Sequence, residues 1–168
     1  LFLIAAAGYS PFPAGDTAML KDICDIPLAM PTDMHGLRFL LAQAGRLMNV
    51  SPNVSLEIDS LAILMEAVSA GLIATVQPGA ALARLKHKSF QKVELADASL
   101  MRRNLLASLS DEELSPAALA TRVVMRNVAI EQVELGNWLG ASLCVDPSQT
   151  RDPEARSPKV DSAGPPPD

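Results

Sequence analysis

The sequence is poor in cysteine and in net positive charge, and each shortage excludes a class of protein. Its two cysteines, Cys24 and Cys144, lie far apart and outside any CxxC or CxxH pattern. This spacing argues against a disulfide framework or a zinc site and favours a reducing, cytoplasmic setting. The net charge of −5 and the pI near 5.0 argue against a nucleic-acid-binding surface on this chain. No apolar run approaches the length of a membrane span, so we expect no membrane association.

Motifs that carry catalysis or phosphate binding are also missing. His35 and His87 are the only histidines, and neither belongs to a Ser/His/Asp arrangement. The patterns GxSxG, GxxxxGK[ST] and HExxH do not occur, and each strand-to-helix turn carries at most one glycine. We therefore expect no catalytic residue, no metal site and no cofactor, which agrees with a binding module rather than an enzyme.

The pattern that is present is of the α/β class, and it is clearest in a strand–helix–strand unit in the middle of the chain. Apolar and polar residues alternate over 54–58, as in a strand. Asp59 or Ser60 is placed to cap the next helix, and Gly71 to end it. The apolar run 72–76 is typical of a parallel strand that is covered on both faces. These elements predict a right-handed βαβ crossover.

The same periodicities predict the other elements. Further strands are expected over 1–7, 26–30, 90–96 and 101–109. Helices are expected over 17–24 and 37–48, with one more turn over 80–85 and a long amphipathic helix that begins at Ser115-Pro116. The basic cluster 86–88 is interpreted as a solvated loop. Residues 146–168 are rich in Pro, Asp and Ser without periodic apolar residues, so we expect a disordered tail.

Three stretches follow one another in a recognisable order. They are Pro31-Thr32 with Gly36-Leu37-Arg38, then Met65 to Pro78, then Arg102-Arg103 with Ser115-Pro116-Ala117. Together they cover about residues 1–141 and resemble the effector-binding domain of LysR-type transcriptional regulators. The resemblance implies an α/β fold of the periplasmic-binding-protein-like type 2, with two lobes and a small effector in the cleft between them.

The resemblance also implies a division of the chain. Residues 1–15 would hold a crossing strand, 16–98 the second lobe, and 99–145 the return strand with a C-terminal helix that packs on the first lobe. The family's N-terminal helix-turn-helix and half of its first lobe have no counterpart, so the chain is expected to be a fragment of a longer protein. That protein would bind DNA through the helix-turn-helix and would form a dimer or tetramer.

The first candidate site is the turn that joins a strand to the helix over 37–48. It contains Thr32, Asp33, His35 and Gly36 at the edge of the sheet where α/β proteins bind ligands. Free N–H groups and the helix dipole favour an anion there. Thr32 could donate its hydroxyl hydrogen, and His35 could donate to an oxyanion. Alternatively, these residues only cap the helix.

The second candidate site is the end of the strand over 72–76, with Thr75, Gln77 and Pro78. The resemblance implies that this segment lines the cleft and that Gln77 is its most useful polar group. The alternative is a strand end followed by a tight turn. Arg102 and Arg103 could contact a ligand, pair with acids or lie on a solvated surface.

The expected function is therefore effector sensing. A small organic anion would bind between the lobes and control transcription by the complete regulator. The alternatives are a solute-binding protein or an enzyme of the same two-lobe architecture, or a truncated product without function.

Overall fold

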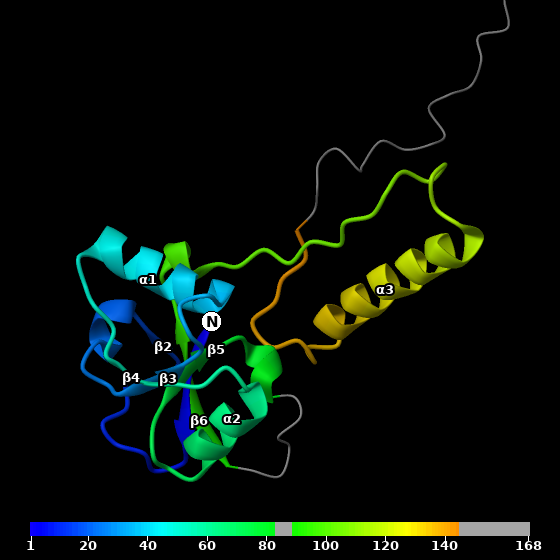
Figure 1. The fold of residues 1–168 in the computed structure, drawn as a ribbon. Coiled ribbons are helices and arrows are strands. Elements are labelled where there is room, and N and C mark those ends of the chain that lie inside the picture. Colours follow the sequence, from blue (N-terminus) through cyan, green and yellow to red (C-terminus); the bar gives the residue numbers. More distant parts are fainter. Residues whose placement is uncertain (83–88, 145–168) are drawn as a thin grey trace, which may run out of the picture.

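A mixed β-sheet with helices on both faces forms the middle of the lobe at the left of Figure 1. A computed structural model describes residues 1–82 and 89–144. Four strands pair in the order β2-β6-β1-β5, and two more form the parallel pair β3-β4. The strands are β1 (Phe2–Ala6), β2 (Thr17–Ala18), β3 (Leu28–Met30), β4 (Val54–Glu57), β5 (Thr75–Gln77) and β6 (Phe90–Leu95).

β3 joins the two sheets. The backbone N–H of Ala29 donates to the carbonyl of Ala74 at 2.8 Å, and a parallel bridge pairs Leu28 with Ala74 just before β5. β3 therefore lies between β4 and β5. Among the described strands, only β1 runs against its neighbours, since it pairs antiparallel with both β5 and β6.

Two hydrophobic cores lie on opposite faces of the sheet, and β1 contributes to both. Leu3 and Ala5 point into the core beneath α1 (Gly36–Met48), whereas Phe2 and Ile4 point into the core beneath α2 (Leu61–Ser69). This alternation is the period-2 pattern of a strand covered on both faces. The prediction of a buried strand over 1–7 is thus confirmed, and the fold is a three-layer α/β/α arrangement.

The two covering helices begin and end where their sequences predict. The Ser60 hydroxyl accepts from the N–H of Ile63, which decides between Asp59 and Ser60 as the cap of α2. Gly71 has a φ of 74°, as needed to end that helix. At the other face, α1 buries Leu37, Leu41 and Ala44. Near its end Met48 packs against the core, whereas Leu47 is 74% exposed.

Two predicted elements differ in the structure, and the helical turn expected over 80–85 is confirmed in its described part. Residues 17–24 form β2 and the short 3₁₀ helix η1 (Leu20–Ile23) rather than one helix, because Ala18 pairs with Leu95 of β6. Residues 80–85 were expected to form a helical turn, and the described part of them belongs to the 3₁₀ helix η2 (Gly79–Leu82). The expected strand over 72–76 begins later, since Leu72 is 75% exposed and β5 starts at Thr75.

The prediction of a strand over 101–109 is wrong. After the 3₁₀ helix η3 (Ala98–Leu100), residues 101–110 are exposed and pair with no strand of the described chain. A strand needs a hydrogen-bonded neighbour, and the described residues offer this segment none.

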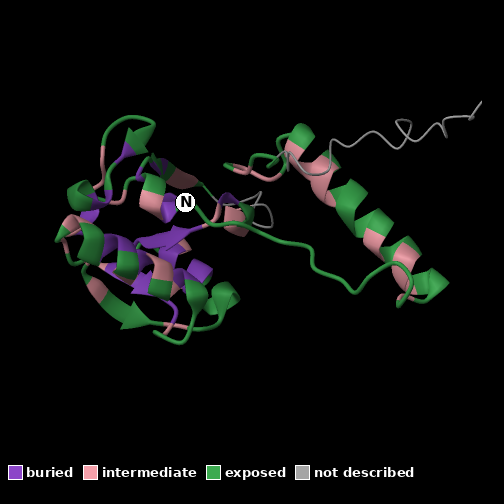
Figure 2. Cartoon of the chain, turned by 90° about the horizontal axis from the view of Figure 1, so that it is seen from above, coloured by how far each residue is buried: buried purple, intermediate pink, exposed green. Residues whose placement is uncertain are grey.

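The long helix α3 (Pro116–Glu134) forms as predicted, with Ser115 accepting from the N–H of Ala118, but it buries no residue. Figures 1 and 2 show it apart from the sheet, and Figure 2 shows no buried position on it. The chain then returns to the lobe, where Leu139 packs against the core of α2. The predicted apolar face stays a prediction, since Val123, Val124 and Val128 are exposed and no described element covers them.

Two predictions fall on residues outside the described ranges: the basic cluster 86–88 and the tail 146–168. Within the described residues, no helix is long and apolar enough to cross a membrane.

Candidate functional site

A cavity of about 330 Å³ opens at the carboxyl ends of β3, β4 and β5. It is the edge at which parallel α/β sheets bind ligands. The polar side chains that line it belong to His35, Asp59, Gln77 and Arg102. The apolar part of its wall is made by Pro31, Leu37, Ile58, Leu61, Leu64, Pro78, Ala80 and Ala81.

Thr32 and Asp59 are joined beside this cavity. The N–H and the hydroxyl of Thr32 both donate to Asp59 Oδ1, each at 2.9 Å. The sequence predicted an anion at Thr32, and the structure shows that a carboxylate of the chain itself accepts both hydrogen bonds.

The pKa of Asp59 reflects this pair. The backbone N–H of Thr32 lowers the pKa most, followed by the Thr32 hydroxyl, because both bonds favour the charged carboxylate. Desolvation opposes them, and the nearby His35 adds a smaller lowering. Asp59 therefore stays ionised and puts a negative charge at the rim of the cavity.

His35 caps α1. Its Nδ1 accepts from the N–H of Leu37 at 3.2 Å, and its carbonyl accepts from the N–H of Phe39. An accepting Nδ1 carries no proton, so in this tautomer the proton is on Nε2. The capping alternative is thus realised, yet His35 also lines the cavity and keeps Nε2 as a donor.

Thr75 and Gln77 both belong to β5, but Thr75 is bonded within the sheet and Gln77 lines the cavity. Thr75 is fully buried, and its hydroxyl donates to the carbonyl of Ala29 at 2.7 Å, so it holds β5 against β3. Gln77 lines the cavity and donates through Nε2 to the Thr75 hydroxyl at 3.4 Å. Its Oε1 has no hydrogen-bond partner among the described residues.

The structure therefore brings together three of the predicted site residues, His35, Gln77 and Pro78, on one cavity. The other four do not line it. They are Thr32 and Thr75, whose hydroxyls are bonded within the protein, and the exposed Asp33 and Gly36.

Sequence reasoning gave too little weight to Asp59 and Arg102. Asp59 follows a strand directly and so belongs at the same sheet edge, but the adjacent Ser60 made a cap the simpler interpretation. Arg102 lies in the exposed segment that was predicted as a strand, and it forms no ion pair with any described residue. Among the described residues, no group of three or more His, Cys, Asp or Glu side chains could hold a metal ion.

The comparisons with known proteins identify the family. The model of the LysR substrate binding domain matches residues 1–129, and the chain therefore belongs to this family. Its fold is the type 2 periplasmic-binding-protein-like α/β fold, as the sequence predicted. No curated protein matches the chain in sequence.

Solved structures agree on the fold. The effector binding domain of QuiR in complex with shikimate is 20% identical, with a TM-score of 0.60 over 77% of this chain and 61% of that one. A C206 mutant of OxyR from Corynebacterium glutamicum is 18% identical, with a TM-score of 0.54 over 84% of this chain. A putative LysR family regulator from Pseudomonas aeruginosa, PA01, is 15% identical, with a TM-score of 0.54 over 76% of this chain. The chain spans 45% of each of the last two structures.

Proposed function

We propose that this chain is the effector-sensing portion of a LysR-type transcriptional regulator and that it binds a small organic anion in the cavity at the ends of β3, β4 and β5. The observation that carries the proposal is the lining of this cavity. Arg102 has no anionic partner among the described residues, and it lines the same cavity as His35, whose Nε2 is a donor, and Gln77, whose Oε1 has no partner among the described residues. Apart from Asp59, the other residues that line the cavity are apolar.

Each part of the lining has a role in this proposal. The anionic group of the effector lies against Arg102, with the His35 Nε2 proton as a second donor, since a guanidinium matches the geometry of a carboxylate. The apolar body of the effector packs on Leu64 and its neighbours. Gln77 accepts from a hydroxyl or amide of the effector through Oε1.

Asp59 limits which ligands fit. Its charge repels a second anionic group on the side of Thr32, so an effector with one anionic group is favoured over one with two. An effector reaches the Thr32 donors only by displacing Asp59. The QuiR domain, whose complex contains shikimate, is a family member with a ligand that carries one carboxylate.

The wider role follows from the family. We propose that the chain is a non-enzymatic cytoplasmic module. In it, residues 16–98 form the effector-binding lobe. Residues 1–15 enter this lobe from the other lobe, and residues 99–145 return to the other lobe. Effector binding would shift the closure of two lobes in the complete protein, and an oligomer would transmit the shift to DNA-binding domains.

A thermal-shift screen tests the proposal. The purified chain is heated with a panel of small carboxylates, aromatic acids and sulfonates, and the panel is repeated with Arg102→Gln and Arg103→Gln. Both arginines are exposed neighbours, but only Arg102 lines the cavity. We expect at least one anion to raise the melting temperature, with the rise lost in Arg102→Gln and kept in Arg103→Gln. Equal rises in all three proteins would contradict the site.

A further inference from the structure

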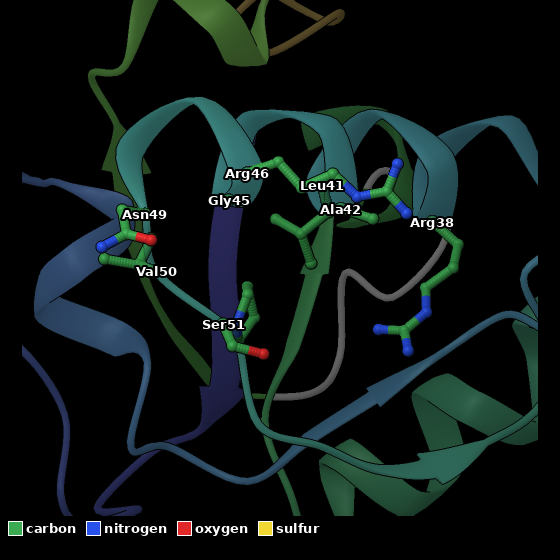
Figure 3. A pocket seen from close by; sticks show the side chains of 9 residues that line it. Arg38, Leu41, Ala42, Gly45, Arg46, Asn49, Val50 and Ser51 are labelled. Atoms are coloured by element: carbon green, nitrogen blue, oxygen red, sulfur yellow. The ribbon is translucent and has the colours of Figure 1, made fainter.

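A second cavity, of about 370 Å³, lies along α1 and shares no lining residue with the first (Figure 3). Its wall carries two guanidinium groups, from Arg38 and Arg46, together with the side chains of Asn49 and Ser51. Neither arginine forms an ion pair with a described residue. In a chain of net charge −5, two unpaired arginines on one cavity need an explanation.

The positions of Arg38, Ala42 and Arg46 along α1 leave a gap between the two arginine side chains. Arg38, Ala42 and Arg46 recur every four residues and so share one face of the helix. Ala42 ends at its Cβ, which leaves room where a longer side chain would separate the guanidinium groups. Figure 3 shows both arginine side chains on the same side of the helix.

The floor of the cavity is closely packed. A Cβ on Gly45 would lie 2.7 Å from the carbonyl oxygen of Val50, so the chain after α1 passes directly beneath the helix. The N–H groups of Asn49 and Val50 donate to the carbonyls of Arg46 and Gly45, at 3.3 and 2.9 Å. Two of the carbonyls that would repel an anion at a helix C-terminus are therefore already bonded.

Helix stability does not explain this pair of charges. A cation in the last turn interacts favourably with the helix dipole, which accounts for Arg46. Arg38 lies in the first turn of α1, where the dipole disfavours a positive charge, and it has no anionic partner there. The residue as a whole is half-buried.

We propose that this cavity is a second ligand site, which binds a small organic dianion between Arg38 and Arg46. Two guanidinium forks match a group with two negative charges, such as a phosphate monoester or a dicarboxylate. Ser51 bonds the polar part of the ligand, and Leu41 and Pro52 contact its carbon skeleton. The requirement for two charges distinguishes this site from the effector cavity, where Asp59 favours a single charge.

An NMR titration of the ¹⁵N-labelled full chain with glycerol 3-phosphate and with succinate tests the proposal, with uncharged glycerol and singly charged acetate as controls. A salt concentration of about 150 mM screens non-specific attraction. We expect saturable shifts of the Gly45, Val50 and Ser51 amides with either dianion, and a dissociation constant at least tenfold higher for glycerol and acetate.

Four variants decide between a built site and simple charge attraction, and the fourth, Gln77→Ala, lies in the other cavity. The double change Arg38→Gln with Arg46→Gln removes both charges, Ala42→Leu fills the space while keeping them, and Arg126→Gln removes an exposed charge on α3. We expect at least a tenfold loss of affinity in the first two and no change in the third or in Gln77→Ala. Unchanged binding to Ala42→Leu, equal loss in Arg126→Gln, or no saturable binding of either dianion to the wild type would overturn the proposal.

Discussion

Thr32 and Asp59 stand at matching positions beyond two parallel strands, and this register is why they meet. Met30 of β3 pairs with Glu57 of β4, and each of the two side chains lies two residues further along its strand. The N–H of Ile58 donates to the carbonyl of Met30 at 2.9 Å, which fixes the strand ends beside each other. The carboxylate of Asp59 is thereby held against both donors of Thr32.

The change Thr32→Val raises the pKa of Asp59 part of the way to its ordinary value. Only the hydroxyl bond is lost, whereas the backbone N–H of residue 32, the larger cause of the lowered pKa, is retained. A ¹³C NMR titration of the carboxyl group measures the change. Thr75→Val is the control, since the Thr75 hydroxyl bonds Ala29 instead. A pKa that does not move in Thr32→Val would contradict the hydrogen bond.

The pH dependence of stability follows from the direction of that shift. Because the pKa of Asp59 is lower in the folded protein, the Thr32–Asp59 pair favours folding above the ordinary value of 3.8, and its contribution is lost as the pH falls through the folded value. In Asp59→Asn the loss of stability between pH 4 and pH 2 should be shallower. Urea unfolding at several pH values measures it, and identical profiles would contradict the prediction.

The change Thr75→Val should reduce the free energy of unfolding by about 1–3 kcal/mol, because it leaves the carbonyl of Ala29 without its hydroxyl partner in the core. Valine matches threonine in shape, so little packing is lost. Equilibrium unfolding in urea measures the change. Thr32→Val, where the hydroxyl bond is exposed, serves as the comparison and should cost less. A Thr75→Val protein as stable as the wild type would contradict the role of this hydroxyl.

The change Gly79→Ala should detach the segment that follows α3 and leave the sheet intact. A Cβ at Gly79 would overlap the Leu139 carbonyl oxygen and lie 2.7 Å from its Cβ, so one of the two chains must move. Trp138, the only tryptophan, is half-buried in this segment and reports its environment directly. We expect its fluorescence to shift to longer wavelength in Gly79→Ala.

Gly36→Ala is the matched control for that experiment, because a Cβ at Gly36 meets nothing within 4 Å. Its tryptophan fluorescence should equal that of the wild type. An unchanged spectrum in Gly79→Ala would show that Leu139 does not pack on Gly79.

The sequence predicted the fold better than the site, for physical reasons. Periodicity and caps are local, and they predicted β1, α1 and α2 correctly. The segment 101–109 has strand-like residues, but a strand also needs a neighbour, which periodicity cannot reveal. Asp59 and Thr32 are 27 residues apart, and only the register of β3 with β4 brings them together. The buried position of Thr75 likewise depends on β3 lying next to β5.

The most direct test of the effector site is an NMR titration of the labelled full chain with the carboxylate that gives the largest thermal shift. The side-chain amide of Gln77 is the reporter, since it lines the cavity and belongs to the strand beneath it. We predict saturable movement of this resonance, with the amides of residues 38–52 less affected, and loss of the effect in Arg102→Gln. Saturable binding that leaves the Gln77 amide unmoved would contradict effector sensing at this cavity.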